Sequence, residues 1–446
     1  MQPWKLNLKL VFKMKNFFLK KTTNLIDTKK CTVGIIGLGY VGLPLSVLFV
    51  KNNFNIIGFD IDKKKITKIK KDNSYIDRIS NKDVSLINKN GKFYSNYSNI
   101  NKCDVIIVCV PTPLKKNDSP DLSFIKATIN SIKKFLKNGQ ILILESTSYP
   151  GTTREEVYEK IKKKFKVGEE FFLGFSSERI DPGTNENSIQ KIPKVVSGYS
   201  RNCLKVISNF YSKSFNTIVE SKSIEIAEFS KLLENIYRSV NIGFINEMKI
   251  LADKMNIDIF DVIAVASTKP YGFRKFHPGP GIGGHCIPID PNYLYWKSTQ
   301  LGLPAKFIKL SAEINIQVLN FIIKKILKNL KSQKITLVKS KILILGISYK
   351  KNVDDIRESA SIKLINKLFK EGVKNISAYD PYVEDKIKGK KIKKIKLLSS
   401  KILNSFDVVI LMTDHDLFDY DLIKNNAKLI IDCRGRFEVK DNVQRG

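Results

Sequence analysis

The chain has 446 residues, 43% of them hydrophobic, so it is long enough for two or three domains with sizeable buried cores, and disorder of the whole chain is excluded. Its 77 Lys and Arg residues against 43 Asp and Glu give a formal charge of +34. The basic residues are scattered rather than gathered in one motif, so we expect no nucleic-acid partner. No apolar run reaches the ~18 residues that span a bilayer, so we expect no transmembrane segment.

The six cysteines form neither a CxxC pair nor a regular pattern, and only three His are present. This composition predicts no disulfide framework and no metal site. Free thiols in a chain of this size suit the reducing cytoplasm, which is the compartment we expect.

Residues 1–30 are basic, contain Trp4 and several Phe, and have no acidic residue before Asp27. We interpret them as a flexible basic extension. An amphipathic surface helix or a targeting peptide would have a similar composition, and both alternatives stay open.

The apolar, β-rich run at 32–37 is followed by a Gly-rich turn, a helical pattern and a second apolar run at 55–60, which predicts a βαβ unit. Further buried strands are predicted within 104–114 and 140–147. Strands that alternate with helices indicate a doubly wound parallel sheet.

A long helix is predicted from 223 to about 252, because this stretch has a helical period, one Gly and no Pro. A Gly- and Pro-rich loop occupies 278–291, and a second α/β unit begins near Lys341. We therefore predict an α/β fold with two Rossmann-like doubly wound parallel-sheet domains joined by a long central helix.

The turn after the first strand reads GLGYVG, the GxGxxG pattern of dinucleotide-binding folds. Gly37 would permit the tight turn, Gly39 would let a pyrophosphate approach the backbone, and Gly42 would let helix and strand pack closely. Tyr40 and Val41 lie in the same turn and are assigned to the cofactor site. A purely structural Gly turn is the alternative.

Asp60 lies at the end of the second strand, where a carboxylate can accept hydrogen bonds from a ribose diol and would repel a 2′-phosphate. This favours NAD over NADP, although the basic run at 63–65 leaves NADP open. Lys65, Thr112 and Thr147 complete the predicted cofactor site. Each threonine follows a strand, and each would also fit an ordinary turn.

The stretch PGPGIGGHCIPIDP at 278–291 places four Gly and four Pro around one cysteine, Cys286. A thiolate is a good nucleophile toward an aldehyde, so Cys286 is a candidate nucleophile. A buried structural thiol is the alternative, and it is the expected state of the other five cysteines.

Seven segments occur in this order: GIIGLGYVGLPLS, VCVPTPL, ESTSYPGTT, FSSERIDPG, AEFSKLLENIYRSVNIGFINE, GPGIGGHCIPIDP and LGISYKKNVDDIRES. Together they resemble the UDP-glucose/GDP-mannose (nucleotide-sugar) dehydrogenase family over about residues 32–435. The resemblance implies NAD as cofactor, an NAD-binding Rossmann domain at 31–222, a central helical dimerisation domain with the catalytic Cys loop at 223–335, and a UDP-sugar-binding α/β domain at 336–446.

The resemblance also implies a catalytic mechanism. Cys286 would carry a thiohemiacetal and then a thioester during two successive hydride transfers to NAD, and water would release a carboxylate. The implied catalytic residues are Cys286, Lys231, Asn235, Glu178, Asp290 and Thr147. Lys231 would stabilise oxyanions. Asn235, one helical turn later, would hold a water or an oxyanion.

Glu178 would act on the hydrolytic water, Asp290 would assist proton transfer and Thr147 would lie near the nicotinamide, again by resemblance. The implied substrate-binding residues are Lys231, Asn235, Gly283, Lys350 and Arg357. Arg357 suits a two-pronged contact with a phosphate. A salt bridge to a neighbouring acid, Asp354, Asp355 or Glu358, is its alternative.

ESTSYPGTT, SSERIDPG and GGHCIPIDP are most similar to the UDP-N-acetyl-D-glucosamine 6-dehydrogenase branch. We therefore expect oxidation of UDP-GlcNAc to its uronate, as a precursor of surface polysaccharide. The family resemblance implies a homodimer or higher homo-oligomer formed through the central helix. UDP-GalNAc, UDP-ManNAc and UDP-glucose stay open as substrates. Two other classes also remain: a catalytically silent NAD-binding protein, and a two-electron 3-hydroxyacid dehydrogenase, which needs no second α/β domain.

Overall fold

The structure is a computed structural model that describes residues 17–76, 78–179, 186–284, 286–383, 392–440 and 442–446. The chain divides into two compact units, Met1–Leu233 and Glu234–Gly446. Helix α9 (Ile224–Lys254) runs through the boundary and contributes to both units.

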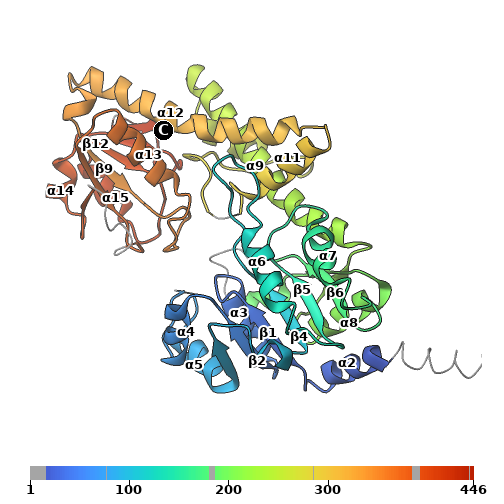
Figure 1. The fold of residues 1–446 in the computed structure, drawn as a ribbon. Coiled ribbons are helices and arrows are strands. Elements are labelled where there is room, and N and C mark those ends of the chain that lie inside the picture. The colour runs from blue at the N-terminus through green and yellow to red at the C-terminus, as the bar shows by residue number, and fades with distance from the viewer. Residues whose placement is uncertain (1–16, 77, 180–185, 285, 384–391, 441) are drawn as a thin grey trace, which may run out of the picture. The chain divides into compact units, whose positions relative to one another are not determined.

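An eight-stranded sheet with the order β3-β2-β1-β4-β5-β6-β7-β8 forms the framework of the first unit (Figure 1). The first six strands follow the 3-2-1-4-5-6 order of dinucleotide-binding folds. All neighbouring strands are parallel except β6 and β7. The strands are β1 (Thr32–Ile36), β2 (Asn55–Phe59), β3 (Gly91–Tyr94), β4 (Val105–Val108), β5 (Ile141–Leu144), β6 (Phe172–Ser176), β7 (Lys194–Gly198) and β8 (Ile218–Glu220).

The central strands of this sheet are apolar throughout because helices cover both faces. Every residue of β4 (VIIV) and β5 (ILIL) is buried. The helices of the unit are α3 (Gly42–Lys51), α4 (Lys63–Lys70), α5 (Asn81–Asn90), α6 (Ser123–Ile132), α7 (Glu159–Ile161) and α8 (Arg201–Ser212).

The structure differs from the flexible extension expected over residues 1–30, because part of it is a packed helix, α2 (Phe17–Asp27). Ile26 joins the core of the first unit, and Thr22 Oγ1 donates to the Gly139 carbonyl at 2.8 Å. Asp27 pairs with Lys213, which lies at the end of α8, at 2.8 Å. Residues 1–16 lie outside the described residues.

The second unit contains a six-stranded parallel sheet with the order β11-β10-β9-β12-β13-β14. Its strands are β9 (Lys341–Leu345), β10 (Asn375–Tyr379), β11 (Lys393–Lys394), β12 (Val408–Leu411), β13 (Ile430–Asp432) and β14 (Val443–Arg445). Its other helices are α10 (Ile259–Ala266), α11 (Asp290–Gln300), α12 (Lys306–Ser332), α13 (Ala360–Lys370), α14 (Ser400–Asn404) and α15 (Tyr420–Asn426). The predicted fold class, with two parallel-sheet α/β domains, is confirmed.

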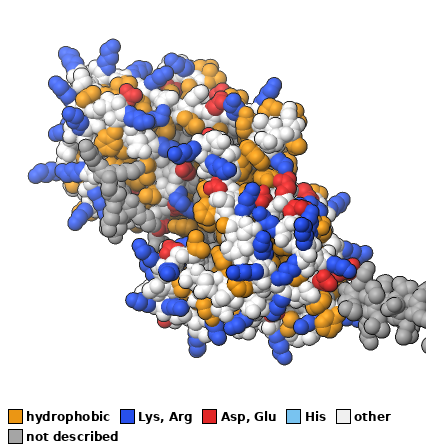
Figure 2. Space-filling view, viewed as in Figure 1, with side chains coloured by type: hydrophobic (Ala, Val, Ile, Leu, Met, Phe, Trp, Pro, Cys, Tyr) orange, Lys and Arg blue, Asp and Glu red, His pale blue; other side chains and the backbone are white. Residues whose placement is uncertain are grey.

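Lys and Arg side chains are spread over the visible face of both units among hydrophobic and uncharged ones (Figure 2). Within the part of the chain that the structure describes, no helix has the length and apolar character needed to cross a membrane.

Candidate active site

The Gly-rich turn after β1 has the shape that a dinucleotide requires. Gly37 has a φ of +91°, and a Cβ on it would lie 2.5 Å from the Cys109 carbonyl oxygen. A Cβ on Gly42 would lie 2.0 Å from the Gly37 carbonyl oxygen, so a side chain there would separate α3 from β1. A Cβ on Gly39 would meet nothing within 4 Å, which leaves the backbone open to a pyrophosphate. The turn therefore fits NAD.

Asp60 lies beside this turn and is nearly buried, with 6% of its surface exposed. Its Oδ2 accepts from the Leu38 N–H at 2.9 Å and from Lys65 Nζ at 2.9 Å. Its Oδ1 accepts from the Asp62 N–H at 2.9 Å. The carboxylate is thus held at the point where an adenosine ribose would approach, and Lys65 acts on this site through Asp60. Thr112 is buried in the loop after β4.

Lys231 and Thr147 are brought together in the first unit. Lys231 lies on α9 with 7% of its surface exposed, and its Nζ donates to Thr147 Oγ1 at 2.8 Å. Thr147 follows β5, so this ammonium stands at the carboxyl edge of the sheet, where open α/β sheets bind ligands. A cation fixed here can stabilise a developing oxyanion.

Glu228, which the sequence reading did not single out, clamps the loop that follows Thr147. It accepts from the Gly151 N–H at 2.6 Å, from the Thr153 N–H at 2.9 Å and from Thr153 Oγ1 at 2.7 Å. Burial raises the pKa of Glu228 to about 7. Glu228 lies three residues before Lys231 on one helix face, which is the signal that could have identified it.

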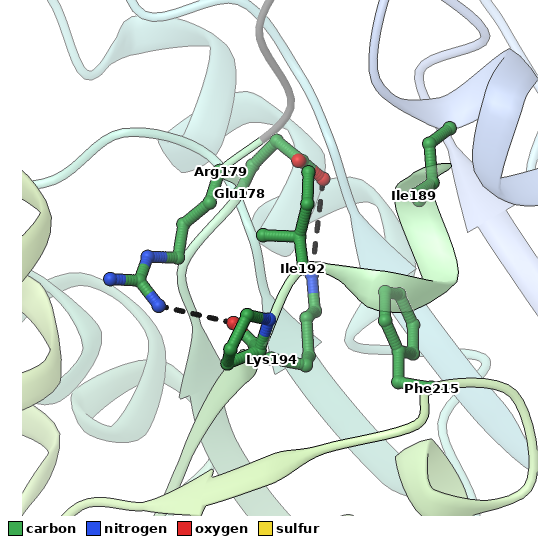
Figure 3. Close-up of a pocket in the computed structure, with 7 residues that line it drawn as sticks. Glu178, Arg179, Ile189, Ile192, Lys194 and Phe215 are labelled. Carbon is green, nitrogen blue, oxygen red and sulfur yellow. Dashed lines mark hydrogen bonds and ion pairs between the residues drawn. The ribbon is translucent and has the colours of Figure 1, made fainter. Parts of the chain in front are cut away.

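Glu178 shares a buried cation with a second carboxylate. Lys194 Nζ lies 3.0 Å from Glu145 Oε1 and 3.8 Å from Glu178 Oε2, and the exposed fractions of the three side chains are 4%, 0% and 9%. Figure 3 shows the Glu178 carboxylate directed at this ammonium beside a small pocket. The pocket is lined by Glu178, Arg179, Ile189, Ile192, Pro193, Lys194 and Phe215.

The charges of this cluster perturb one another. Burial raises the pKa of Glu145, although Lys194 opposes the rise. Burial alone would lower the pKa of Lys194, but the negative charges of Glu145 and Glu178 outweigh it and raise that pKa. Tyr211 donates a hydrogen bond to Glu145 from its hydroxyl. These charges favour the ammonium form of Lys194, which forms an ion pair with Glu178.

In the second unit, the structure brings together Asn235, Asp290 and the Cys286 loop. Asn235 Nδ2 donates to Asp290 Oδ2 at 2.6 Å, and Asp290 is 1% exposed. The Cys286 carbonyl accepts from the Asp290 N–H at 2.8 Å, which ties the loop to the start of α11. Cys286 itself is exposed. His285 lies outside the described residues.

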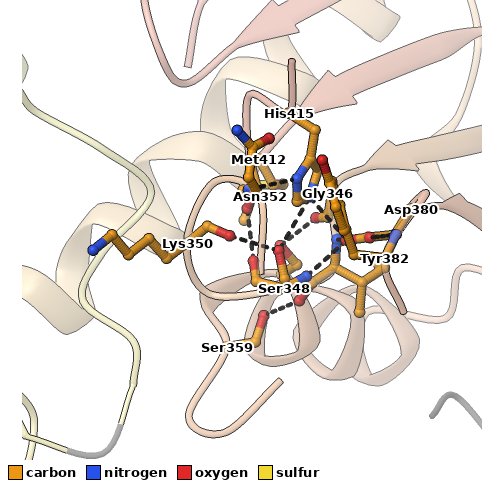
Figure 4. A network of polar contacts seen from close by, with 12 residues as sticks. Gly346, Ser348, Lys350, Asn352, Ser359, Asp380, Tyr382, Met412 and His415 are labelled. Carbon is orange, nitrogen blue, oxygen red and sulfur yellow. Dashed lines mark hydrogen bonds and ion pairs between the residues drawn. The ribbon is translucent and has the colours of Figure 1, made fainter. Parts of the chain in front are cut away.

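Arg357 and Lys350 belong to the loop between β9 and α13. Arg357 forms a two-pronged salt bridge with Asp355, with Nη2 2.6 Å from Oδ2 and Nε 3.0 Å from Oδ1, so the alternative that the sequence left open is present. The Lys350 side chain points away from the polar network around it (Figure 4).

That network fixes the loop after β9. Asp380 Oδ2 accepts from the Ile347 N–H at 2.6 Å and the Ser348 N–H at 2.9 Å, as Asp60 accepts from the turn after β1. His415 Nε2 lies 3.1 Å from the same Asp380 oxygen, and its Nδ1 accepts from the Asn352 N–H at 3.0 Å. Asp380 is consequently covered by a buried histidine, whereas Asp60 faces a lysine at the surface.

The known proteins most informative here are nucleotide-sugar dehydrogenases. The UDP-N-acetyl-D-glucosamine 6-dehydrogenase of Pseudomonas aeruginosa is 34% identical over 80% of this chain and 84% of its own length. The UDP-N-acetyl-D-mannosamine dehydrogenase of Methanocaldococcus jannaschii is 33% identical over 90% of this chain and 91% of its own. The solved UDP-D-ManNAc dehydrogenase of Pyrococcus horikoshii is 27% identical, with a TM-score of 0.81 over 92% of this chain and 96% of that one.

The family domains cover most of the chain. Residues 31–215 match the NAD binding domain of the UDP-glucose/GDP-mannose dehydrogenase family, residues 225–317 its central domain, and residues 343–439 its UDP binding domain. The chain therefore belongs to the UDP-glucose/GDP-mannose dehydrogenase family, and it is an NAD-dependent dehydrogenase of nucleotide sugars.

Proposed function

We propose that the chain catalyses the four-electron oxidation of the C6 hydroxymethyl group of a UDP-N-acetylhexosamine to a carboxylate, with UDP-GlcNAc as the preferred substrate. The observation that carries this proposal is the exposed thiol of Cys286 in a loop tied to Asp290 and Asn235. The product would serve as a precursor of surface polysaccharide.

The other cysteines are poor candidates for the nucleophile. Burial raises the pKa of Cys31, Cys103 and Cys433 to about 12, and it raises the pKa of Cys109 well above the ordinary value. A thiol that stays protonated is a weak nucleophile. All six cysteines are free, which suits a reducing compartment such as the cytoplasm.

Each step follows from groups of this chain. The turn at 37–42 and Asp60 would hold NAD, which when bound would supply the hydride acceptor for the two oxidations. The first converts the alcohol to an aldehyde, the Cys286 thiolate adds to that aldehyde, and the second converts the thiohemiacetal to a thioester. Water then displaces the thiolate, which regenerates Cys286 and gives the carboxylate.

Lys231 carries the cation for the oxyanions of these steps, and Thr147 orients its ammonium. Asp290, hydrogen-bonded by Asn235, takes part in proton transfer near the thiol. Glu178 positions the hydrolytic water, with Lys194 fixing its carboxylate. Lys350, Arg357 and Gly283 are assigned to the UDP-sugar.

The 2-acetamido sugar is supported by the relatives, whose names include UDP-N-acetyl-D-glucosamine and UDP-N-acetyl-D-mannosamine. The test is kcat/KM for purified enzyme with NAD and UDP-GlcNAc, UDP-ManNAc, UDP-GalNAc and UDP-glucose. The proposal expects UDP-GlcNAc to exceed UDP-glucose by at least about 10-fold, since a pocket built for a polar substituent rejects analogues that lack it. A shift in melting temperature with NAD but no turnover on any sugar would favour a silent NAD-binding protein.

We further propose that the protein forms a homodimer through α9. Exposed apolar side chains recur along this helix at intervals of three, four and seven residues, which places them on one face. They are Ile226, Phe229, Leu233, Tyr237, Phe244 and Leu251. Sedimentation velocity tests this: wild type should sediment as a dimer or larger, and Phe244→Glu as a monomer.

A further inference from the structure

The glycines before Cys286 lie directly on the side chain of Tyr349. A Cβ on Gly283 would fall 2.7 Å from the Tyr349 Cβ, and a Cβ on Gly284 would fall 2.8 Å from its Cε2. Both distances are shorter than those between real atoms of this kind. The Gly284 N–H also donates to the Arg357 carbonyl at 3.0 Å. The loop can reach Tyr349 only because these two positions carry no side chain.

Hydrogen bonds within the second unit fix the backbone around Tyr349. It lies four residues after the end of β9, and its N–H donates to the Asp355 carbonyl at 3.0 Å. The two preceding N–H groups are bound by the buried carboxylate of Asp380 (Figure 4). Glu358 adopts a left-handed φ of +51°, and its carbonyl oxygen would lie 3.1 Å from a Cβ on Gly283. Non-glycine residues adopt that conformation at an energetic cost, which the surrounding contacts must offset.

The beginning of the same loop is fixed to two helices. The Gly279 N–H donates to Asn246 Oδ1 on α9 at 2.9 Å, and Asn246 Nδ2 donates to Asn315 Oδ1 on α12 at 2.9 Å. A Cβ on Gly281 would lie 3.0 Å from the Asn315 carbonyl oxygen. The path of the backbone is thus set at 279–281 by buried amides and at 283–284 by Tyr349, two residues before Cys286.

We propose that Tyr349 is a positioning residue for Cys286: its side chain supports Gly283 through the Cβ and Gly284 through the ring, and this support fixes where the thiol stands. The inference rests on the proposed function, because it takes Cys286 as the nucleophile. The ring makes the contact with Gly284, so phenylalanine at position 349 should preserve this contact and alanine should remove it. No bond to Tyr349 is made or broken during the reaction.

The support that Tyr349 gives to the loop can be tested without turnover. The measured quantity is the rate at which iodoacetamide alkylates Cys286, monitored by peptide mass spectrometry. Tyr349→Ala should change this rate at least 5-fold, because the loop loses its support. It should also lower kcat about 100-fold, the loss that a misplacement of about 1 Å can cause. Tyr349→Phe should stay within 2-fold of wild type in both. The dissociation constant of NAD should stay within 2-fold in all variants.

A second variant breaks the same contact from the other side. Gly284→Ala places a methyl group against Cε2, Cδ2 and Cζ of the Tyr349 ring, so its effects should be at least as large as those of Tyr349→Ala. If the two changes act through one contact, the double variant should be no worse than Gly284→Ala alone. Equal alkylation of Cys286 in wild type and Tyr349→Ala, failure of Tyr349→Phe to rescue, or multiplied effects in the double variant would each overturn the proposal. Alkylation of Cys286 can be measured whether or not the enzyme oxidises UDP-GlcNAc, so the outcome of this test is distinguishable from a failure of the proposed function.

Discussion

Replacing Lys194 by Met would leave two carboxylates buried together with no cation between them. Methionine has a similar length and is apolar, so the change removes the charge with little change in volume. In wild type the ammonium lies 3.0 Å from Glu145 and 3.8 Å from Glu178. The variant therefore isolates the electrostatic role of Lys194 in the first unit.

The expected magnitude follows from the distances and the burial. At an effective dielectric of about 20, unit charges at the Lys194–Glu145 distance attract by about 5.5 kcal/mol. The desolvation of the charged groups offsets part of this, and removing one partner of a buried pair typically costs about 3–5 kcal/mol. We expect the variant to lose about that much unfolding free energy at pH 8. For a unit of this size the loss corresponds to a melting temperature lower by on the order of 10 °C.

The loss should depend on pH in a definite direction. Burial raises the pKa of Glu145, and removal of Lys194 raises it further. A carboxyl whose pKa is higher in the folded than in the unfolded state binds its proton more tightly when folded, so stability is regained as the pH falls through the folded-state pKa. The defect should thus be largest at pH 8 and smaller at pH 5.5.

This defect is measured by thermal unfolding monitored by circular dichroism. The relevant transition is the one whose midpoint temperature rises when NAD is added. The double variant Lys194→Met/Glu145→Gln should recover at least half of the loss, since one of the two unpaired charges is gone. A loss below about 1 kcal/mol at pH 8, or an equal loss at both pH values, would refute the reasoning.

Three further variants test other parts of the site. Lys231→Met removes the cation beside Thr147, and kcat should fall about 100- to 1000-fold while the NAD dissociation constant, measured by fluorescence titration, stays within about 2-fold. Burial raises the pKa of Glu228 to about 7, so the free energy of unfolding of the first unit should fall by up to about 3 kcal/mol as the pH rises from about 4.5 to 7. In Glu228→Gln, unfolding curves measured at several pH values should lack this pH-dependent contribution. Asp60→Ala removes the predicted ribose acceptor and frees Lys65, so NAD binding should weaken at least about 10-fold and the NADP/NAD preference should rise; unchanged preference would contradict the assigned role of Asp60.

The features that the sequence predicted well depend on short stretches of chain. The turn at 37–42 and the apolar strands around it carry their own signals, because glycine spacing and buried parallel strands are local patterns. The same holds for the uninterrupted helical period of α9. Family resemblance then assigned Lys231, and the structure places its ammonium against Thr147.

The features that the sequence did not reveal depend on tertiary burial. Lys194 and Glu145 read as ordinary charged residues, and only the packing of β5 against its neighbours shows that both are enclosed. Tyr349 lies more than sixty residues after the glycines that it contacts.

Product stoichiometry tests the central claim most directly. With limiting UDP-GlcNAc and excess NAD, wild type should form two NADH per sugar and a uronate, identified by mass spectrometry. Cys286→Ala should form no uronate while still binding NAD. One NADH per sugar with accumulation of the aldehyde, or uronate formation by Cys286→Ala at the wild-type rate, would contradict a four-electron oxidation through a thioester on Cys286.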